Sequence, residues 1–362
     1  MNLMISEEQE ALAAAVREWL AARTDLAAAR AAGDGAPPAR PADLREAAAL
    51  GLVGLLRDEG DGEGGGTYAD LALVVEELGR AASPLPLGQA ALACRALDGA
   101  GIGGDAAGRA AAGEVLVVPV LPEPGEEPVR ASSGPEGALV LDGRVAVAVG
   151  ARDAGFLLAA ATGPDGAPVL ALTGADAPGV VRTARAALDI TRDFAAVALD
   201  GARVPAGSWS PVDAGTVEVL AAASALHHAA DALGAADRLL AMTLRYVRER
   251  RQFGRAIGSF QAVKHHCADM AVDVERARAC VRAGARALDA GEPGARRVAI
   301  AEAAAVAGEA CSRVAGTALQ LHGGMGFTWE HDLHLYLRRV KTGELLGGTP
   351  RYHYARLMDL VA

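Results

Sequence analysis

The order of helical and strand patterns along the chain restricts its fold more than any other feature of the sequence. Residues 114–207 hold short apolar runs separated by Gly, Pro and Asp, such as VLVVPVL, VAVAV and FLLAAA. Runs of this length and spacing predict antiparallel strands, whereas the segments before and after them carry the spacing of amphipathic helices. Helices and strands that come in blocks rather than in alternation argue against a doubly wound sheet and favour a mainly helical α+β fold.

Three domains are expected from this order. Residues 1–113 are predicted to form an N-terminal helical domain, residues 114–210 a central antiparallel β barrel, and residues 211–362 a C-terminal four-helix bundle. Within the last region, residues 221–248 and 260–290 have the length of bundle helices.

Local signals support the helical assignment of the first region. Ser6, followed by Gln9 three residues later, is a capping-box pattern that predicts a helix start. The glycine-rich stretch 57–65 predicts a loop, because glycine at this density cannot hold a helix. Residues 68–80 return to helical spacing, with one apolar face made of Leu71, Val74, Val75 and Leu78.

The composition favours a helical core and argues against nucleic-acid-binding, secreted and membrane-spanning proteins. Hydrophobic residues make up 51% and aromatic residues 4% of the chain, so the core depends on Ala, Leu and Val, as in closely packed helices. The net charge of −10 argues against a nucleic-acid-binding protein. The four cysteines lack CxxC spacing, the N-terminus has no basic segment followed by an apolar one, and no apolar run reaches the roughly 20 residues of a membrane span. A cytoplasmic protein with reduced thiols is expected.

The segment 248–261, RERRQFGRAIGSFQ, is the first that suggests chemistry. It places three arginines within four positions at a break in the helical pattern, and a guanidinium group is suited to bidentate binding of phosphate. The alternative interpretation is a solvated arginine patch at a helix end.

The segment 319–330, LQLHGGMGFTWE, is the second. Gly323 and Gly324 lack side chains, so backbone N–H groups there can approach a phosphate or a ring. The alternative is a plain helix terminus, since glycine commonly ends helices.

Taken together, these segments resemble the acyl-CoA dehydrogenase family. The resemblance covers essentially the whole chain and includes RRQFGRAIGSFQAVKHHCADM, LQLHGGMGFTWEHDLHLYLRRVKT, DLALVVEELGRAASPLPL and ALDGARVPAGSW. It implies α,β-dehydrogenation of an acyl-CoA thioester, in which a carboxylate removes the α-proton and FAD accepts the β-hydrogen as hydride. It also implies that FAD lies across a subunit interface and that electron-transfer flavoprotein accepts the electrons.

The resemblance also assigns cofactor contacts. The ADP portion of a flavin held mainly by a neighbouring subunit would meet the arginine-rich and glycine-rich segments, with Arg250 at the pyrophosphate and Phe253 beside the adenine. The full set of implied cofactor-binding residues is Arg250, Phe253, Gln320, Gly323, Gly324 and Thr349.

The sequence departs from the family at both known positions of the catalytic base. The Glu-Gly-Thr that carries the base near the C-terminus reads Gly347-Gly348-Thr349 here. Some members carry the base on an earlier helix, and that position is Ser224. Neither glycine nor serine is a useful proton acceptor near neutral pH, so the catalytic residue is unknown.

The central region departs from the family as well. The Thr-Glu-Pro…Gly-Ser-Asp loop that touches the flavin ring has Pro122-Glu123-Pro124 as its nearest match, without a following Gly-Ser-Asp. The Trp-Ile-Thr strand that faces the ring corresponds to Ala146-Val147-Ala148. Alanine can neither stack on an isoalloxazine nor donate a hydrogen bond to it.

These departures predict a subunit that contributes to a neighbour's flavin but lacks the elements for its own. Heteromeric acyl-CoA dehydrogenases of sterol-degrading bacteria are built this way, so the chain resembles the complementing subunit of an α2β2 assembly. A homodimer or homotetramer is the alternative assembly. The alternative functions are a non-catalytic structural or acyl-thioester-binding subunit, and a flavin oxidase or monooxygenase on the same fold.

Other polar residues carry weaker hypotheses. Glu344 precedes Gly347 by about one helical turn and is a possible substitute base, the alternative being a solvated carboxylate. Asp231 and Glu218 are weaker candidates for the same role. Histidines occur at 265–266, 331 and 334 without carboxylates at metal-binding spacing, so no metal site is expected.

Overall fold

The computed structural model describes residues 4–31, 41–57 and 65–362. Most of the predicted loop at 57–65 therefore lies outside the described residues. The chain begins with helices α1 (Glu7–Ala21), α2 (Leu26–Ala31), α3 (Pro41–Ala49), α4 (Tyr68–Ala81), α5 (Leu87–Ala100) and α6 (Asp105–Ala111).

The helix starts follow their local sequence. Ser6 accepts a hydrogen bond from the backbone N–H of Gln9, whose side chain accepts one from the N–H of Ser6, and this confirms the predicted capping box of α1. A second capping box, formed by Thr67 and Asp70, starts α4. The predicted apolar face of α4 is buried, which confirms its helical period.

The middle of the chain forms one eight-stranded sheet. Its strands are β1 (Val117–Val120), β2 (Val129–Ser133), β3 (Leu139–Val149), β4 (Phe156–Thr162), β5 (Pro168–Gly174), β6 (Val180–Ala184), β7 (Phe194–Val204) and β8 (Trp209–Pro211), with a 3₁₀ turn η1 (Pro135–Gly137) before β3. The strand order is β6-β7-β3-β2-β4-β5-β8, and β1 pairs with β4.

The mainly helical α+β fold is confirmed, but the sheet differs from the predicted antiparallel barrel in two respects. The pairing order runs from β6 to β8 without closing into a barrel. Two pairs are parallel, because β1 lies along Phe156–Ala159 of β4 and β2 lies along the last two residues of the same strand. Apolar alternation predicts that a segment is a strand, but it carries no information on which neighbour the strand pairs with or in which direction.

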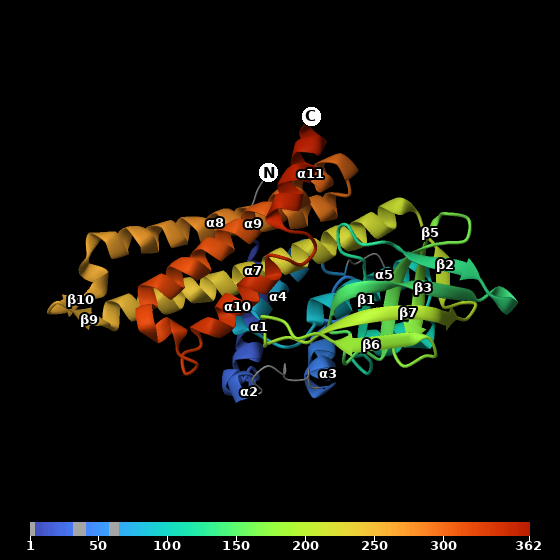
Figure 1. The fold of residues 1–362 in the computed structure, drawn as a ribbon, viewed down its shortest axis with the longest axis horizontal. Coiled ribbons are helices and arrows are strands. Elements are labelled where there is room, and N and C mark those ends of the chain that lie inside the picture. The colour runs from blue at the N-terminus through green and yellow to red at the C-terminus, as the bar shows by residue number, and fades with distance from the viewer. Residues whose placement is uncertain (1–3, 32–40, 58–64) are drawn as a thin grey trace.

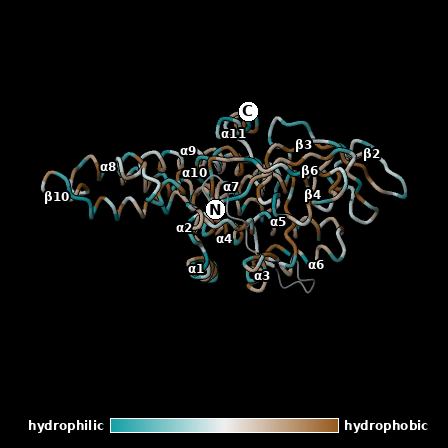
Figure 2. Tube along the Cα trace, turned by 60° about the horizontal axis from the view of Figure 1, so that its bottom comes forward, coloured by the Kyte–Doolittle hydropathy of each residue, from teal (hydrophilic) through white to brown (hydrophobic). Residues whose placement is uncertain are grey.

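Long helices make up the C-terminal part, as predicted. They are α7 (Ala214–Glu249), α8 (Gln261–Ala290), α9 (Pro293–His322), α10 (Leu333–Gly343) and α11 (Pro350–Val361), with the hairpin strands β9 (Arg251–Gln252) and β10 (Arg255–Ala256) and the 3₁₀ turns η2 (Ile257–Ser259) and η3 (Gly323–Phe327). The hairpin lies at one end of the long helices and the eight-stranded sheet at the other (Figure 1). Hydrophilic and hydrophobic residues alternate along α8 (Figure 2), as expected for a helix with one buried face.

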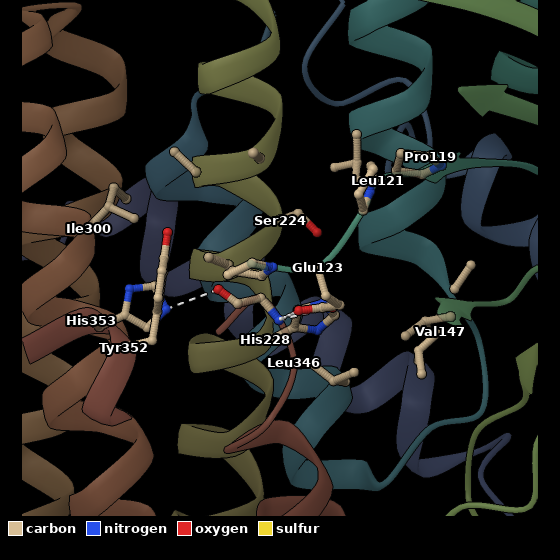
Figure 3. A pocket seen from close by; sticks show the side chains of 18 of the residues that line it. Pro119, Leu121, Glu123, Val147, Ser224, His228, Ile300, Leu346, Tyr352 and His353 are labelled. Atoms are coloured by element: carbon tan, nitrogen blue, oxygen red, sulfur yellow. Dashed lines mark hydrogen bonds between the residues drawn. The ribbon is translucent and has the colours of Figure 1, made fainter. Parts of the chain in front are cut away.

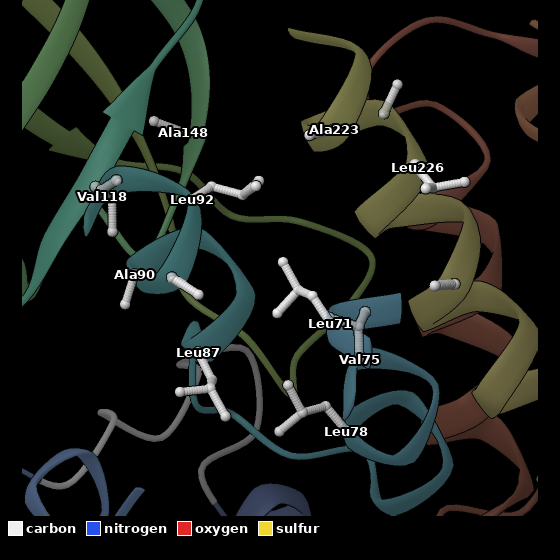
Figure 4. Close-up of a cluster of buried hydrophobic side chains, with 14 of the residues drawn as sticks. Leu71, Val75, Leu78, Leu87, Ala90, Leu92, Val118, Ala148, Ala223 and Leu226 are labelled. Atoms are coloured by element: carbon white, nitrogen blue, oxygen red, sulfur yellow. The ribbon is translucent and has the colours of Figure 1, made fainter. Parts of the chain in front are cut away.

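The three parts of the chain share one core. Leu71 of α4, Leu87 of α5, Val118 of β1 and Leu226 of α7 belong to the same buried cluster (Figure 4). Helices α4 and α7 are in backbone contact, because a Cβ atom on Gly234 would lie 1.8 Å from the carbonyl oxygen of Glu76. This contact sets how closely the first and last helical regions pack against each other.

Candidate active site

A cavity of about 260 Å³ lies where the sheet meets the C-terminal helices (Figure 3). Distant parts of the chain contribute its walls. They are Pro119 of β1 and residues 121–124 after it, residues 147–149 at the end of β3, the α7 face from Glu218 to His228, Leu346 and Gly347 before α11, Tyr352, His353 and Arg356 within α11, and Gln89 and Ile300.

Both positions at which the family carries its base face this cavity. Gly347 lies in the loop between α10 and α11, and Ser224 lies on α7. Gly347 has a φ of 71°, and a Cβ atom there would lie 3.0 Å from Cα of Ala225. A side chain at residue 347 is therefore strained by its backbone conformation and by its contact with α7.

The carboxylate of Glu123, in the segment Pro122-Glu123-Pro124, is held against this loop. The backbone N–H of Gly347 donates to Glu123 at 2.9 Å from Oε2 and 3.2 Å from Oε1. Burial raises the pKa of Glu123, and the hydrogen bonds from the N–H groups of Gly347 and Gly348 oppose that rise only in part. The sequence motif Pro122-Glu123-Pro124 locates Glu123 in the chain. The orientation of its side chain depends on a hydrogen bond from the α10–α11 loop, 224 residues later.

Replacing Glu123 by glutamine is expected to change how stability depends on pH. The folded chain binds the Glu123 proton more tightly than the unfolded chain does, so this group makes stability fall as the pH rises from its ordinary pKa of 4.5 through the raised value. E123Q removes this titration, and its unfolding free energy relative to wild type should therefore improve as the pH rises above 4.5. Urea denaturation at several pH values measures the difference. The matched control is Glu127→Gln, whose side chain is 92% exposed; equal pH profiles for the two variants would contradict the assignment.

Two neutral histidines also line the cavity. Burial lowers the pKa of His228 well below its ordinary value and also lowers that of His353. The Nε2 atom of His353 lies 3.0 Å from the carbonyl oxygen of Gly347. The Nδ1 atoms of both rings are buried and have no hydrogen-bond partner in the part of the chain that the structure describes. The cavity therefore holds polar atoms that a ligand or water can satisfy.

The wall that corresponds to the ring-facing strand of the family is apolar. It consists of Val147, Ala148 and Val149, and it offers no side-chain hydrogen-bond donor. Pro122 beside it has neither a hydroxyl nor a backbone N–H. Since a flavin ring is held by stacking and by donors at its polar edge, this wall does not fit the isoalloxazine part of FAD.

The residues implied in ADP binding gather at the far end of the long helices. Arg250 ends α7, and Phe253 in the following hairpin is 91% exposed with a φ of 52°. Gly323 follows the last turn of α9, and a Cβ atom added there would meet nothing within 4 Å. The two segments are in contact, because the Tyr246 ring stacks on His322 with centroids 4.3 Å apart. An exposed guanidinium, an exposed ring and open glycine backbone fit the ADP part of FAD.

The remaining implied cofactor residues lie at opposite ends of the long helices. Gln320 lies on the last turn of α9, and Gly324 in η3 directly after it, on the side of Arg250. Thr349 lies beside the cavity, where its hydroxyl accepts a hydrogen bond from the N–H of Tyr352 and caps α11. The structure thus separates Thr349 from the other five implied cofactor residues.

Glu344, the substitute base considered above, does not line the cavity. Its carboxylate accepts a hydrogen bond from Ser312 Oγ at 2.8 Å and lies 3.1 Å from Lys341 Nζ. Asp231 is likewise outside the lining, in a buried ion pair with Arg339.

The described ranges contain neither a metal-binding cluster nor a membrane-spanning helix. No group of three or more His, Cys, Asp or Glu side chains there is arranged to hold a metal ion. No helix within those ranges combines the length and the apolar character needed to cross a membrane.

Comparison with known proteins agrees with the geometry. The chain matches the acyl-CoA dehydrogenase N-terminal domain at residues 6–101 and the C-terminal domain at residues 218–359. It is 34% identical to the acyl-CoA dehydrogenase IpdE2 of Mycobacterium tuberculosis over 310 residues, which covers 85% of this chain and 82% of that protein.

Two solved structures of similar fold are heteromeric by name. The ChsE4–ChsE5 complex from Mycobacterium tuberculosis has a chain that superposes with a TM-score of 0.89 at 28% identity, covering 100% of this chain and 99% of that one. A variant of the Tcur3481–Tcur3483 steroid ACAD superposes with a TM-score of 0.87 at 28% identity, covering 98% of both chains. With two matching domains, a relative aligned over most of both sequences and the same fold, the chain belongs to the acyl-CoA dehydrogenase family.

Proposed function

We propose that this chain is the complementing subunit of a heteromeric, FAD-dependent acyl-CoA dehydrogenase. The proposal rests on a contrast between two regions of the chain, the surface at the far end of the long helices and the wall of the cavity. The surface around Arg250 and Phe253 is open and suited to the ADP part of a flavin, whereas the cavity wall at 147–149 is unsuited to the ring. A chain of this kind can help to hold a neighbour's flavin without holding its own.

The heteromeric names of two similar structures support the same assembly. We infer an α2β2 complex with a homologous partner that retains the catalytic glutamate and the Thr-Glu-Pro loop. The proposed substrate is an acyl-CoA from fatty-acid or sterol breakdown, since one of these similar proteins is described as a steroid ACAD.

In this role the chain binds and orients rather than reacts. Arg250 would place its guanidinium at the pyrophosphate, Phe253 would lie against the adenine, and Gly323 with Gly324 would let the backbone approach. FAD, when bound, supplies the hydride acceptor for α,β-dehydrogenation, with electron-transfer flavoprotein as the proposed acceptor of the electrons. The proton acceptor and the ring pocket would come from the partner subunit, because residues 347 and 224 here carry no basic group.

Arg250→Ala tests the proposal in the complex co-expressed with such a partner. A hydrogen bond to a charged group contributes about 1.5–3 kcal/mol, so FAD affinity is expected to fall roughly tenfold to a hundredfold. The measurement is fluorescence titration of the apo-complex with FAD. Arg130→Ala, which removes an arginine that is 75% exposed on β2, is the matched control and should leave affinity unchanged. Equal FAD affinities for the two variants would show that Arg250 does not contact the flavin.

A further inference from the structure

The cavity has two ends of different charge. At one end Glu123 meets Gly347, which packs against Ala225 of α7. At the other end Glu218 of α7 and Arg356 of α11 both line the wall. Seven residues of α7 separate Glu218 from Ala225, which is roughly 10 Å at a helical rise of about 1.5 Å per residue.

The Glu218 carboxylate is already neutralised. Arg297 donates to both of its oxygens, at 2.8 and 2.7 Å, and Arg296 lies 3.6 Å away. The hydrogen bonds from Arg297, with smaller contributions from Arg296 and Arg356, lower the pKa of Glu218, which therefore remains ionised. Three arginines thus surround one carboxylate, and this end of the cavity carries excess positive charge.

Arg356 is the arginine of this group that lines the cavity. Its side chain is partly buried, and among the residues that the structure describes it forms neither a hydrogen bond nor an ion pair. Because the hydrogen bonds and ion pairs of Glu218 go to Arg297 and Arg296, the Arg356 guanidinium can bind a carboxylate or a phosphate from the cavity through a charge-assisted, bidentate contact.

Between the two ends the wall is mainly apolar, with Ser224 and the neutral ring of His228 as polar exceptions on α7. Ala221, Ala222 and Ala225 of α7 face Leu121 and Ile300. The volume of about 260 Å³ is a little below the roughly 300–1,000 Å³ of typical small-molecule sites, which limits the ligand to a chain or a small ring.

We propose that this cavity binds an apolar chain that carries an anionic group, and that Arg356 holds the anion. The anion is either a free carboxylate on an acyl group or a phosphate of coenzyme A, and both offer the oxygen pair that a guanidinium binds. Glu123 at the opposite end disfavours the reverse orientation, since it would place the anion beside a carboxyl group. The inference concerns this chain's own cavity and does not depend on whether the chain completes a partner's flavin site.

Isothermal titration of the full chain with three probes tests the proposal. Decanoate supplies an apolar chain with a carboxylate, decanol supplies a similar chain without charge, and coenzyme A supplies phosphates. For Arg356→Gln we expect binding of decanoate or of coenzyme A to weaken at least tenfold and binding of decanol to stay within twofold, as for the loss of one charged contact. The probe that weakens identifies the source of the anion.

Two further variants separate binding from folding. Arg351→Gln, at an exposed position on the same helix, should bind all three probes as the wild type does. Arg356→Lys retains the charge and should recover part of the lost affinity, which a structural role would not produce. If R356Q and R351Q bind both anionic probes equally well, the proposed anion site does not exist. Flavin content of the co-expressed complex is a separate readout, so failure here leaves the complementing role untouched.

Discussion

Replacing Arg339 by methionine is expected to lower the free energy of unfolding by about 3–5 kcal/mol, the usual effect of breaking a buried ion pair from one side. The Arg339 side chain is 1% exposed, and its Nε and Nη2 atoms donate to Asp231 at 2.8 and 2.7 Å. Its Nη1 atom donates to the carbonyl oxygen of Ser83 at 3.0 Å and to the hydroxyl of Thr191 at 2.7 Å. The variant leaves all three acceptors buried with fewer partners.

The remaining charge on Asp231 makes the loss large. Burial alone raises the pKa of Asp231, but Arg192 and Arg339 outweigh burial and hold it well below its ordinary value. The substitution removes one of these two arginines and leaves the buried carboxyl group with Arg192, 3.3 Å away, as its ion-pair partner. Urea denaturation followed by circular dichroism at neutral pH measures the effect. Arg338→Met is the matched control, because that side chain only stacks over Trp329 and its loss should cost about 1 kcal/mol or less.

Equal midpoints for the Arg339 and Arg338 variants would mean that the ion pair does not stabilise the fold.

Replacing Gly234 by alanine is expected to destabilise the chain by about 3 kcal/mol or more, at the upper end of overpacking effects. The added Cβ would lie 1.8 Å from the carbonyl oxygen of Glu76 and 2.8 Å from the backbone nitrogen of Arg80. Because these are backbone atoms of α4, no rotamer change relieves the clash, and helices α4 and α7 must separate. The separation would reduce packing in the core that joins the two helical regions.

A second glycine gives this prediction an internal control of opposite sign. Gly316 lies on an exposed face of α9, and a Cβ atom there would meet nothing within 4 Å. Gly316→Ala should therefore stabilise the chain by up to about 1 kcal/mol, the difference in helix propensity. If both alanine variants shift the urea midpoint in the same direction, the close backbone contact between α4 and α7 does not exist in the folded protein.

Local sequence predicted the elements of this fold better than their pairing. The capping box at Ser6 and the apolar face of residues 68–80 depend on neighbours within about one helical turn, so both could be predicted. The parallel pairing of β1 and β2 with β4 depends on chain connections between strands, and alternation of apolar residues does not encode those connections.

Residues of the candidate site could be predicted only where they lie within a recognisable sequence motif. The motif comparison identified residues 347 and 224 as the two positions of the family's base, and in the structure both line one cavity. It could not reveal that Glu123 turns toward Gly347 or that Arg356 enters the same space, because each depends on the packing of segments far apart in the sequence. The pair of Asp231 and Arg339 was missed for the same reason, since 108 residues separate its members.

In the proposed complex, this chain contacts the ADP part of a flavin, and a partner subunit holds the flavin ring and supplies the catalytic base. Native mass spectrometry with cofactor counting, on the chain purified alone and on the chain co-expressed with a homologue that retains the glutamate, tests it most directly. The account predicts little FAD on the lone chain, and a mixed tetramer that holds fewer flavins than chains and oxidises acyl-CoA. One tightly bound FAD per chain in the lone protein, together with acyl-CoA oxidation, would contradict it.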